Sequence, residues 1–263
     1  AVVEAMLNDN HRYTSGPQWL AENVLHDRHV IAVAGTHGKT TTTALIAHIM
    51  GNAGQSPSSL IGAEVVGAGI GAQYGTSEYF VVEADESDGT LDVLPLSSIV
   101  LTNVDIDHLD YFGTFEAITA CFAESIERTP GVVVLNADDA GSTDIVRTLA
   151  NDSRVTTFGW SENSTVRITS VQPQGSGTLV EVRIGEHAYR CTLNLRGEHN
   201  VMNFAAAFAM AIRLGVDPAV ACTAASAFRG VARRFTERGD FRGSLLIDDY
   251  AHLPAEISTT IDA

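Results

Sequence analysis

The single lysine of the sequence lies where a phosphate-binding group would be needed. Residues 32–43 read AVAGTHGKTTTT, and Lys39 is the only lysine among the 16 basic residues, the others being arginines. Glycines let backbone N–H groups approach phosphate oxygens, and a compact ammonium fits among those oxygens where a planar guanidinium is too bulky. The pattern predicts a nucleotide-binding loop with the short spacing Gly-x-x-Gly-Lys-Thr. Its residues are Gly35, Thr36, His37, Gly38, Lys39, Thr40 and Thr41.

Acidic side chains follow two further segments that read as strands. VVEADESD places Glu83 at the end of one strand, and TNVDIDHLD follows the next and contains His108. In open parallel sheets ligands bind at the carboxyl ends of strands, and oxygen ligands there suit a nucleotide-bound Mg²⁺. We therefore expect the Thr40 hydroxyl and the Glu83 carboxylate to hold magnesium. Because Mg²⁺ prefers oxygen, His108 by itself reads as a structural histidine.

The elements that must position these residues alternate between strand and helix. Residues 29–35, HVIAVAG, predict a buried parallel strand, and residues 41–54 predict a helix that Gly51 and Gly54 end. The same alternation continues to residue 159. It predicts an α/β fold with a P-loop and a mostly parallel, doubly wound sheet. Residues 165–194 alternate polar and apolar side chains and predict a small antiparallel region of two or three strands.

The last third of the chain predicts two helices and the beginning of another unit. The helices cover residues 200–215 and 217–228, the second with Asp217 as its N-cap and Pro218 at its first position. Residues 244–263 predict a strand followed by a helix. One such unit cannot cover its own apolar faces, so we expect a further domain to follow.

Composition excludes several classes of partner. The 32 acidic and 16 basic residues give a net charge of −16, which argues against nucleic acid and against an anionic membrane surface. No apolar stretch reaches the roughly 18 residues of a membrane span, and the start of the chain lacks the pattern of a signal peptide. Cys121, Cys191 and Cys222 are odd in number and far apart, which predicts reduced, mostly buried thiols. We expect a cytoplasmic protein.

The motifs together resemble those of the Mur ligases, the ATP-dependent amide ligases of peptidoglycan precursor synthesis. The strings that carry the resemblance are AGTHGKTTTT, VEADESDGT, TNVDIDHLDYFG, VLNADD, LRGEHNVMNFAAA, GVARRF and DDYAHLPAEI, in that order. The resemblance implies three domains. Residues 1–28 would be a tail from a UDP-binding domain, residues 29–241 the central ATP-binding domain, and residues 242–263 the beginning of a Rossmann-like C-terminal ligase domain.

The resemblance also implies a role for individual residues. It places Lys39 on the phosphates of ATP and Thr40 and Glu83 on Mg²⁺, and it places His108 on a second Mg²⁺, against the structural interpretation above. Lys39, Glu83 and His108 would form the catalytic set. The remaining nucleotide contacts that it implies are Asn200 at the adenine, Arg234 at ATP, Asp249 at the ribose and His252 beside the nucleotide.

Within the family, the single lysine narrows the choice of substrate. Ligases that add D-glutamate, a diamino acid or a dipeptide resemble one another in using a second, carbamylated lysine near Mg²⁺, and this chain has none. Members that join L-alanine to UDP-N-acetylmuramate and members that add the murein tripeptide remain. Residues 13–25 resemble the tripeptide ligases. The later strings favour L-alanine, and so does Ser87, because the tripeptide ligases usually carry tyrosine at this position. Leu253 departs from the pattern of both groups of ligases, which usually have a second histidine there.

The reaction implied is a ligation in two steps. The lactyl carboxylate of the UDP-sugar attacks the γ-phosphate of ATP, and the amine of L-alanine then attacks the acyl phosphate. Lys39 and Mg²⁺ would offset the repulsion between the anions. Other interpretations stay open: a folylpolyglutamate-type synthetase, a P-loop kinase or switch NTPase, and a nucleotide-binding module without activity.

Overall fold

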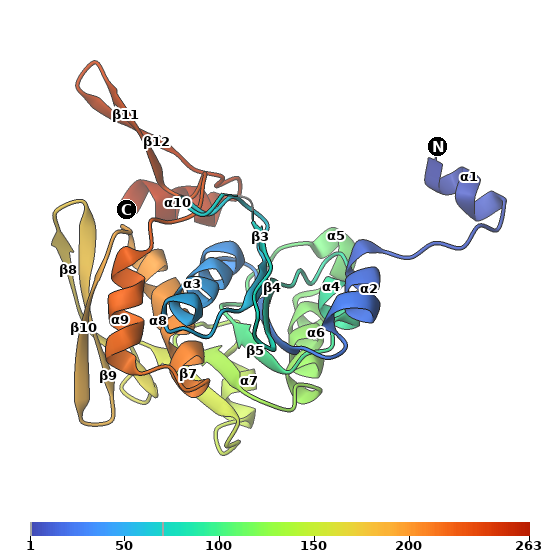
Figure 1. The fold of residues 1–263 in the computed structure, drawn as a ribbon, viewed down its shortest axis with the longest axis horizontal. Coiled ribbons are helices and arrows are strands. Elements are labelled where there is room, and N and C mark those ends of the chain that lie inside the picture. Colours follow the sequence, from blue (N-terminus) through green and yellow to red (C-terminus); the bar gives the residue numbers. More distant parts are fainter. Residues whose placement is uncertain (1, 70) are drawn as a thin grey trace.

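A single large sheet organises the protein. The computed structural model describes residues 2–69 and 71–263, and within them ten strands form a sheet in the order β10-β9-β8-β7-β6-β5-β1-β4-β2-β3 (Figure 1). The strands are β1 (His29–Ala34), β2 (Ser58–Leu60), β3 (Ala72–Gln73), β4 (Tyr79–Glu83), β5 (Ser98–Leu101), β6 (Val133–Asn136), β7 (Val155–Gly159), β8 (Val166–Gln174), β9 (Gly177–Ile184) and β10 (His187–Leu193).

The pairing confirms the predicted fold class. Strands β2, β4, β1, β5, β6, β7 and β8 are parallel to one another. Strands β9 and β10 continue the same sheet at one end in antiparallel pairing, and β3 continues it at the other. At the centre, Val33 of β1 lies opposite Glu83 of β4, and Ala34 lies opposite Leu101 of β5. This register brings the ends of β4 and β5 to either side of the loop that follows β1.

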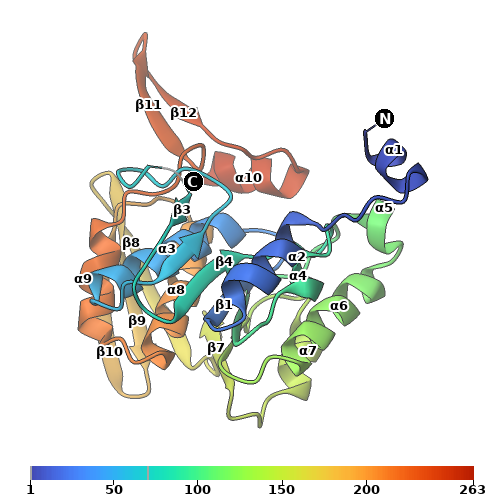
Figure 2. The ribbon, with the colours of Figure 1, turned by 45° about the vertical axis from the view of Figure 1, so that its right-hand side comes forward.

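Helices cover both faces of the sheet, as a doubly wound fold requires. One apolar core lies under α3, α8 and α9, and a second lies on the opposite face, against α6 and α7 (Figures 1 and 2). The helices are α1 (Val2–Asn8), α2 (Gly16–Leu20), the π-helix η1 (Ala21–Leu25), α3 (Lys39–Asn52), α4 (Thr90–Val93), α5 (Leu109–Phe112), α6 (Phe115–Glu127), α7 (Thr143–Thr148), α8 (Glu198–Arg213), α9 (Pro218–Ala227) and α10 (Pro254–Asp262).

Helix α8 packs directly against α3, the helix that carries the lysine. Its central residues 203–211 are buried, and most are alanines that allow close approach, with Phe204 and Phe208 filling the space toward the sheet. Helix α9 begins as predicted, because the Asp217 side chain accepts hydrogen bonds from the N–H groups of Ala219 and Val220. The two helices therefore fix the position of α3 relative to the sheet.

Two segments project from this body. Strands β11 (Thr236–Phe241) and β12 (Ser244–Asp248) form an antiparallel hairpin that points away from the large sheet (Figure 2). Helix α1 also stands apart from the large sheet (Figure 2). The predicted strand and helix after residue 244 are thus β12 and α10, although β12 pairs with β11. Among the described residues, no helix combines the length and the apolar character needed to cross a membrane.

The cysteines differ in part from the prediction. Cys191 of β10 and Cys222 of α9 form a disulfide, with their Cα atoms 4.9 Å apart, so the prediction of three reduced thiols was wrong for this pair. The two cysteines are 31 positions apart in the sequence, and the packing of α9 on β10 that brings them together could not be read from that spacing. Cys121 remains a thiol on α6. Burial, together with the nearby carboxylates of Asp92, Glu86 and Glu124, raises the pKa of Cys121 to about 11.

We predict that Cys121 reacts slowly with iodoacetamide in the folded chain. The thiolate is the reactive form, so a pKa raised from 9.0 to about 11 lowers the thiolate fraction at pH 8 about 100-fold and the alkylation rate with it. The rate should increase as the pH approaches 11. Mass spectrometry after alkylation in denaturant without reductant should find one modified cysteine; three would contradict the disulfide.

Candidate functional site

The loop between β1 and α3 depends on two glycines. Gly35 and Gly38 have positive φ angles of 119° and 83°, which residues with a Cβ rarely adopt. A Cβ on Gly35 would lie 2.3 Å from Thr102 Oγ1, and one on Gly38 would lie 2.3 Å from Asn203 Oδ1. The loop therefore runs in close contact with the end of β5 on one side and with α8 on the other.

The end of β5 holds the loop in place. The Thr36 N–H donates to the carbonyl of Asn103 (3.1 Å), and the His37 N–H donates to Asn103 Oδ1 (2.8 Å). In return, Asn103 Nδ2 and Thr102 Oγ1 donate to the carbonyl of His37 (3.0 and 2.7 Å). These bonds fix the backbone of the loop against the end of β5.

Helix α3 begins with free backbone donors. Its N-cap is Gly38, and no side chain caps it, so the first N–H groups of the helix are available to an anion. Thr42 Oγ1 donates to Asn203 Oδ1 of α8 (3.3 Å), and Thr43 Oγ1 donates to the carbonyl of Lys39 (2.8 Å). The start of α3 thus has the donor chemistry of a phosphate site, with two of its threonines bonded inside the protein.

The ammonium of Lys39 is buried inside the loop. Only 9% of the residue is exposed, and Nζ donates to the carbonyls of Gly35 (2.7 Å) and Thr36 (3.4 Å). Two carboxylates balance its charge: Glu86 Oε2 lies 3.2 Å from Nζ, and Asp85 Oδ2 lies 3.4 Å from it. A buried charge requires such partners because its desolvation is costly.

The two carboxylates differ in how strongly they keep their charge. Burial opposes ionisation of Asp85, but hydrogen bonds from Ser87 and the charge of Lys39 outweigh it and hold the pKa of Asp85 below its ordinary value. For Glu86 burial dominates and raises the pKa, in spite of the attraction of Lys39. Glu86 is therefore the partner that accepts a proton more readily.

Thr40 and Glu83 form the oxygen pair expected of a magnesium site. Thr40 Oγ1 donates to Glu83 Oε1 (2.8 Å), and Glu83 Oε2 accepts from the N–H of Gly62 (3.0 Å). Mg²⁺ commonly binds through one or two protein oxygens, with water and phosphates completing its shell. The pair fits such an ion, and no group of three or more His, Cys, Asp or Glu side chains able to hold a metal occurs in residues 2–69 or 71–263.

His108 lies outside this pair. It precedes α5 in a left-handed conformation (φ 52°), and its Nε2 is 3.5 Å from Asp107 Oδ2. Its charge helps to lower the pKa of Asp85, the partner of Lys39. His108 therefore lies near the carboxylates of Asp85 and Asp107. Its role as a metal ligand stays a prediction.

A cavity of about 270 Å³ opens beside the loop. Three parts of the chain that are far apart in the sequence contribute to its wall, namely the loop with α3, helix α8, and residues 234–260. Residues at the ends of β5, β6 and β7 complete the wall: Thr102, Asn103, Asn136 and Phe158. Seven of the predicted site residues are in its wall, namely His37, Gly38, Thr40, Thr41, Asn200, Arg234 and Asp249. Sequence reasoning from motifs thus located residues from all three parts of one cavity.

Other residues of the cavity were not predicted. Asn203 lies one turn after Asn200 on α8, donates to Asn200 Oδ1 (3.4 Å) and meets Gly38 of the loop. Its spacing of three residues from Asn200 on a helix was a usable signal, because such residues share a face. His199 also lines the cavity, and burial lowers its pKa. Its Nδ1 is buried and has no hydrogen-bond partner within residues 2–69 and 71–263.

The far wall comes from the segment after α9. Asp249 accepts from the N–H groups of Phe235 (2.6 Å) and Ala251 (2.7 Å), and the guanidinium of Arg234 lies 5.3 Å from the centre of the Tyr250 ring. The next predicted residue, His252, is exposed and is not part of the cavity wall; its Nδ1 lies 3.1 Å from the carbonyl of Tyr250. Arg234 and Asp249 are therefore held toward the cavity, and His252 lies outside it.

We predict that alanine at Gly38 destabilises the protein more than alanine at Gly54. Both glycines flank α3 with similar positive φ angles, but a Cβ on Gly54 meets nothing within 4 Å. Gly54→Ala should lower the free energy of unfolding by about 1 kcal/mol, the cost of the left-handed conformation. Gly38→Ala should lower it by about 1–3 kcal/mol more through the clash with Asn203. Urea unfolding measures both, and equal losses would contradict the close contact.

Comparisons with known proteins found related sequences and structures. The family profile of the Mur ligase middle domain matches residues 33–211. The chain is 42% identical over 239 residues to a UDP-N-acetylmuramate–L-alanine ligase from Paenarthrobacter aurescens (strain TC1), covering 89% of this chain and 51% of the relative. It is 40% identical over 236 residues to an enzyme of the same name from Thermobifida fusca (strain YX), covering 89% and 50%. The chain thus spans about half the length of these relatives.

Solved structures share the fold. UDP-N-acetylmuramate-alanine ligase from Thermotoga maritima superposes with a TM-score of 0.84 at 26% identity, over 99% of this chain and 60% of that one. UDP-N-acetylmuramate:L-alanyl-gamma-D-glutamyl-meso-diaminopimelate ligase from Neisseria meningitides superposes with a TM-score of 0.78 at 35% identity, over 88% and 76%. Because the family profile covers more than half of the chain and includes the loop around Lys39, this protein belongs to the Mur ligase family.

Proposed function

We propose that this chain provides the ATP-binding part of a ligase that joins L-alanine to UDP-N-acetylmuramate. The observation that carries the proposal is the buried Lys39 ammonium beside a cavity lined by Asn200, Arg234 and Asp249. The names of the relatives at 40–42% identity support the choice of substrates. In this proposal residues 29–241 act as the ATP-binding domain, residues 1–28 and 242–263 belong to neighbouring domains, and the protein works in the cytoplasm.

The triphosphate would bind at the start of α3. The free N–H groups after Gly38 and the ammonium of Lys39 offer donors and positive charge at one point. In the structure the charged partners of Lys39 Nζ are Glu86 and Asp85. In the proposed complex, phosphate oxygens would replace part of these ionic contacts. Burial raises the pKa of Glu86, whereas hydrogen bonds from Ser87 and the charge of Lys39 lower the pKa of Asp85.

Thr40 and Glu83 would hold Mg²⁺ next to the phosphates. When bound, the ion neutralises charge on the transferring phosphoryl group. Glu83 is fixed by two donors, Thr40 Oγ1 and the Gly62 N–H, so its carboxylate is already oriented toward the loop. In this proposal His108 contributes to a second magnesium site near Asp85.

The base and the ribose would occupy the cavity beyond the loop. Asn200 and Asn203 present amide groups that can pair with a base edge, and Asp249 presents a carboxylate that can accept from ribose hydroxyls. Arg234 faces the same space and can pair with phosphate oxygens. His252, at the edge of this wall, would approach the nucleotide only from outside the cavity.

With the nucleotide held in this way, the chemistry follows from the substrates. A carboxylate oxygen of UDP-N-acetylmuramate attacks the γ-phosphorus, the bond to the β-phosphate oxygen breaks and ADP leaves. The amine of L-alanine then attacks the acyl carbon, loses a proton and displaces phosphate as the amide forms. Lys39 lowers the barrier of the first step by stabilising charge on the transferring group.

We predict that Lys39→Met abolishes ATP turnover in the full-length protein. Loss of the ammonium should reduce the rate of ADP release with L-alanine on the order of 10³-fold and should weaken ATP binding in calorimetry. Arg147→Met is the matched control, because this arginine is exposed and, among the residues that the structure describes, pairs only with Asp144 on α7. Unchanged turnover by the Lys39 variant would refute the proposed function.

A second acceptor has structural support. A solved relative at 35% identity is named for a tripeptide ligase, so the murein tripeptide is the alternative to L-alanine.

We predict faster ADP release with L-alanine than with the tripeptide in the full-length protein with UDP-N-acetylmuramate. The reverse order would assign the protein to the tripeptide reaction, and no release with either acceptor would remove the ligase proposal.

A further inference from the structure

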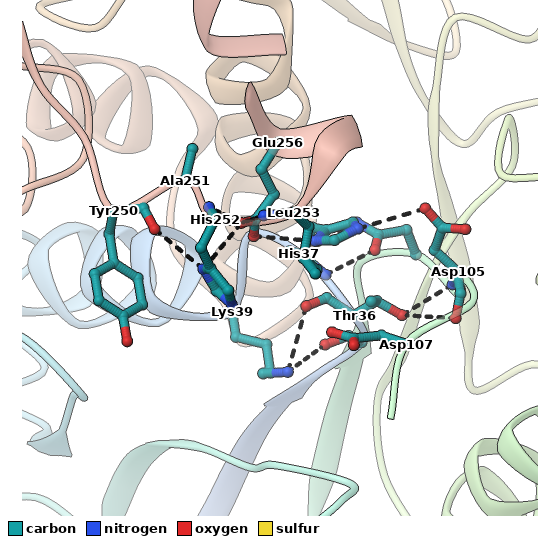
Figure 3. Close-up of polar contacts among 12 residues, drawn as sticks. Thr36, His37, Lys39, Asp105, Asp107, Tyr250, Ala251, His252, Leu253 and Glu256 are labelled. Atoms are coloured by element: carbon teal, nitrogen blue, oxygen red, sulfur yellow. Dashed lines mark hydrogen bonds and ion pairs between the residues drawn. The ribbon is translucent and has the colours of Figure 1, made fainter. Parts of the chain in front are cut away.

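The side chain of His37 connects the phosphate loop to α10. Its Nδ1 lies 3.2 Å from Glu256 Oε1, and its Nε2 lies 3.5 Å from Asp105 Oδ2 (Figure 3). Both nitrogens of the imidazole therefore face carboxylates from other parts of the chain. The contact with Glu256 joins residues 219 positions apart.

Glu256 has a second function at the start of its own helix. Its Oε2 accepts hydrogen bonds from the N–H groups of His252 (3.1 Å) and Leu253 (3.4 Å). Burial opposes its ionisation, but these bonds and the charges of His37 and His252 outweigh it and lower the pKa of Glu256. One carboxylate thus shapes the turn before α10 with one oxygen and reaches the phosphate loop with the other.

The position of α10 matters for the cavity. Glu256, Thr259 and Thr260 complete its wall next to Gly38 of the loop. Among the described residues, β12 pairs only with the projecting strand β11. The segment that contains β12 and α10 therefore contributes no strand to the large sheet. The contact of Glu256 with His37 is therefore a direct attachment of this segment to the phosphate loop.

We propose that His37 is a positioning residue that anchors α10 to the phosphate loop, so that nucleotide affinity depends on the His37–Glu256 pair. The inference rests on the proposed function, because it takes the cavity as the nucleotide site. It differs from a direct contact of His37 with phosphate, in which Glu256 would play no part. It also differs from a role of Glu256 limited to the start of its own helix, in which His37 would play no part.

A double-mutant cycle separates these roles. ATP binding with Mg²⁺ is measured by calorimetry for the chain and for His37→Ala, Glu256→Ala and the double variant. Each single substitution should weaken binding about 3- to 10-fold, the range for a half-buried ion pair with hydrogen bonds. The double variant should bind about as weakly as the weaker-binding single variant, because the second substitution removes a contact that is already lost.

Hydrogen exchange in the absence of nucleotide provides the second readout. His37→Ala should speed exchange in residues 252–260, although it changes only the phosphate loop. The control is His26→Ala, which removes an exposed histidine paired with the neighbouring Asp27 and should change neither binding nor exchange. Circular dichroism verifies that each variant is folded.

Two results would overturn the proposal. The first is a double variant whose loss of affinity equals the product of the two single losses, which would show independent roles. The second is unchanged exchange of α10 in His37→Ala. If the unmodified chain binds no ATP, the proposed function fails, whereas the exchange measurement still tests the anchoring contact by itself.

Discussion

The site depends on one buried positive charge. Lys39 places its ammonium under the loop that follows β1, where two backbone carbonyls and the carboxylates of Glu86 and Asp85 surround it. A charge at such a position is stable only if its partners are fixed. The loop that carries two of these partners is fixed by its close contacts. Its glycines pack against the end of β5 and against the buried face of α8.

The order of the strands explains how distant motifs meet. Because β1 lies between β4 and β5, the residues that follow all three strands reach one edge of the sheet. Glu83 arrives there from β4, Asn103 from β5 and the loop from β1, while α8 adds Asn200 and Asn203 from the side of α3. A ligand at this edge contacts backbone and side chains that the sheet already holds rigidly.

The sequence was sufficient for local features and for the motifs, but not for contacts between distant segments. The parallel strands, the antiparallel region after residue 165 and the cap at Asp217 follow periodicities and residue types that act over a few positions. The Cys191–Cys222 disulfide and the His37–Glu256 contact join segments whose proximity depends on packing. Asn203 could have been predicted from the sequence, because it lies three residues after Asn200 and residues at this spacing share one face of a helix. The role of His108 as a metal ligand, which only the family resemblance implies, stays a prediction.

The most direct test of this account is a crystal structure of the chain with Mg²⁺ and a non-hydrolysable ATP analogue. The account predicts the terminal phosphates at the start of α3, within about 3 Å of Lys39 Nζ, with Mg²⁺ on Thr40 and Glu83 and the base near Asn200 and Asn203. An analogue bound elsewhere, with Lys39 still held by Glu86 and Asp85 and the cavity empty, would contradict it.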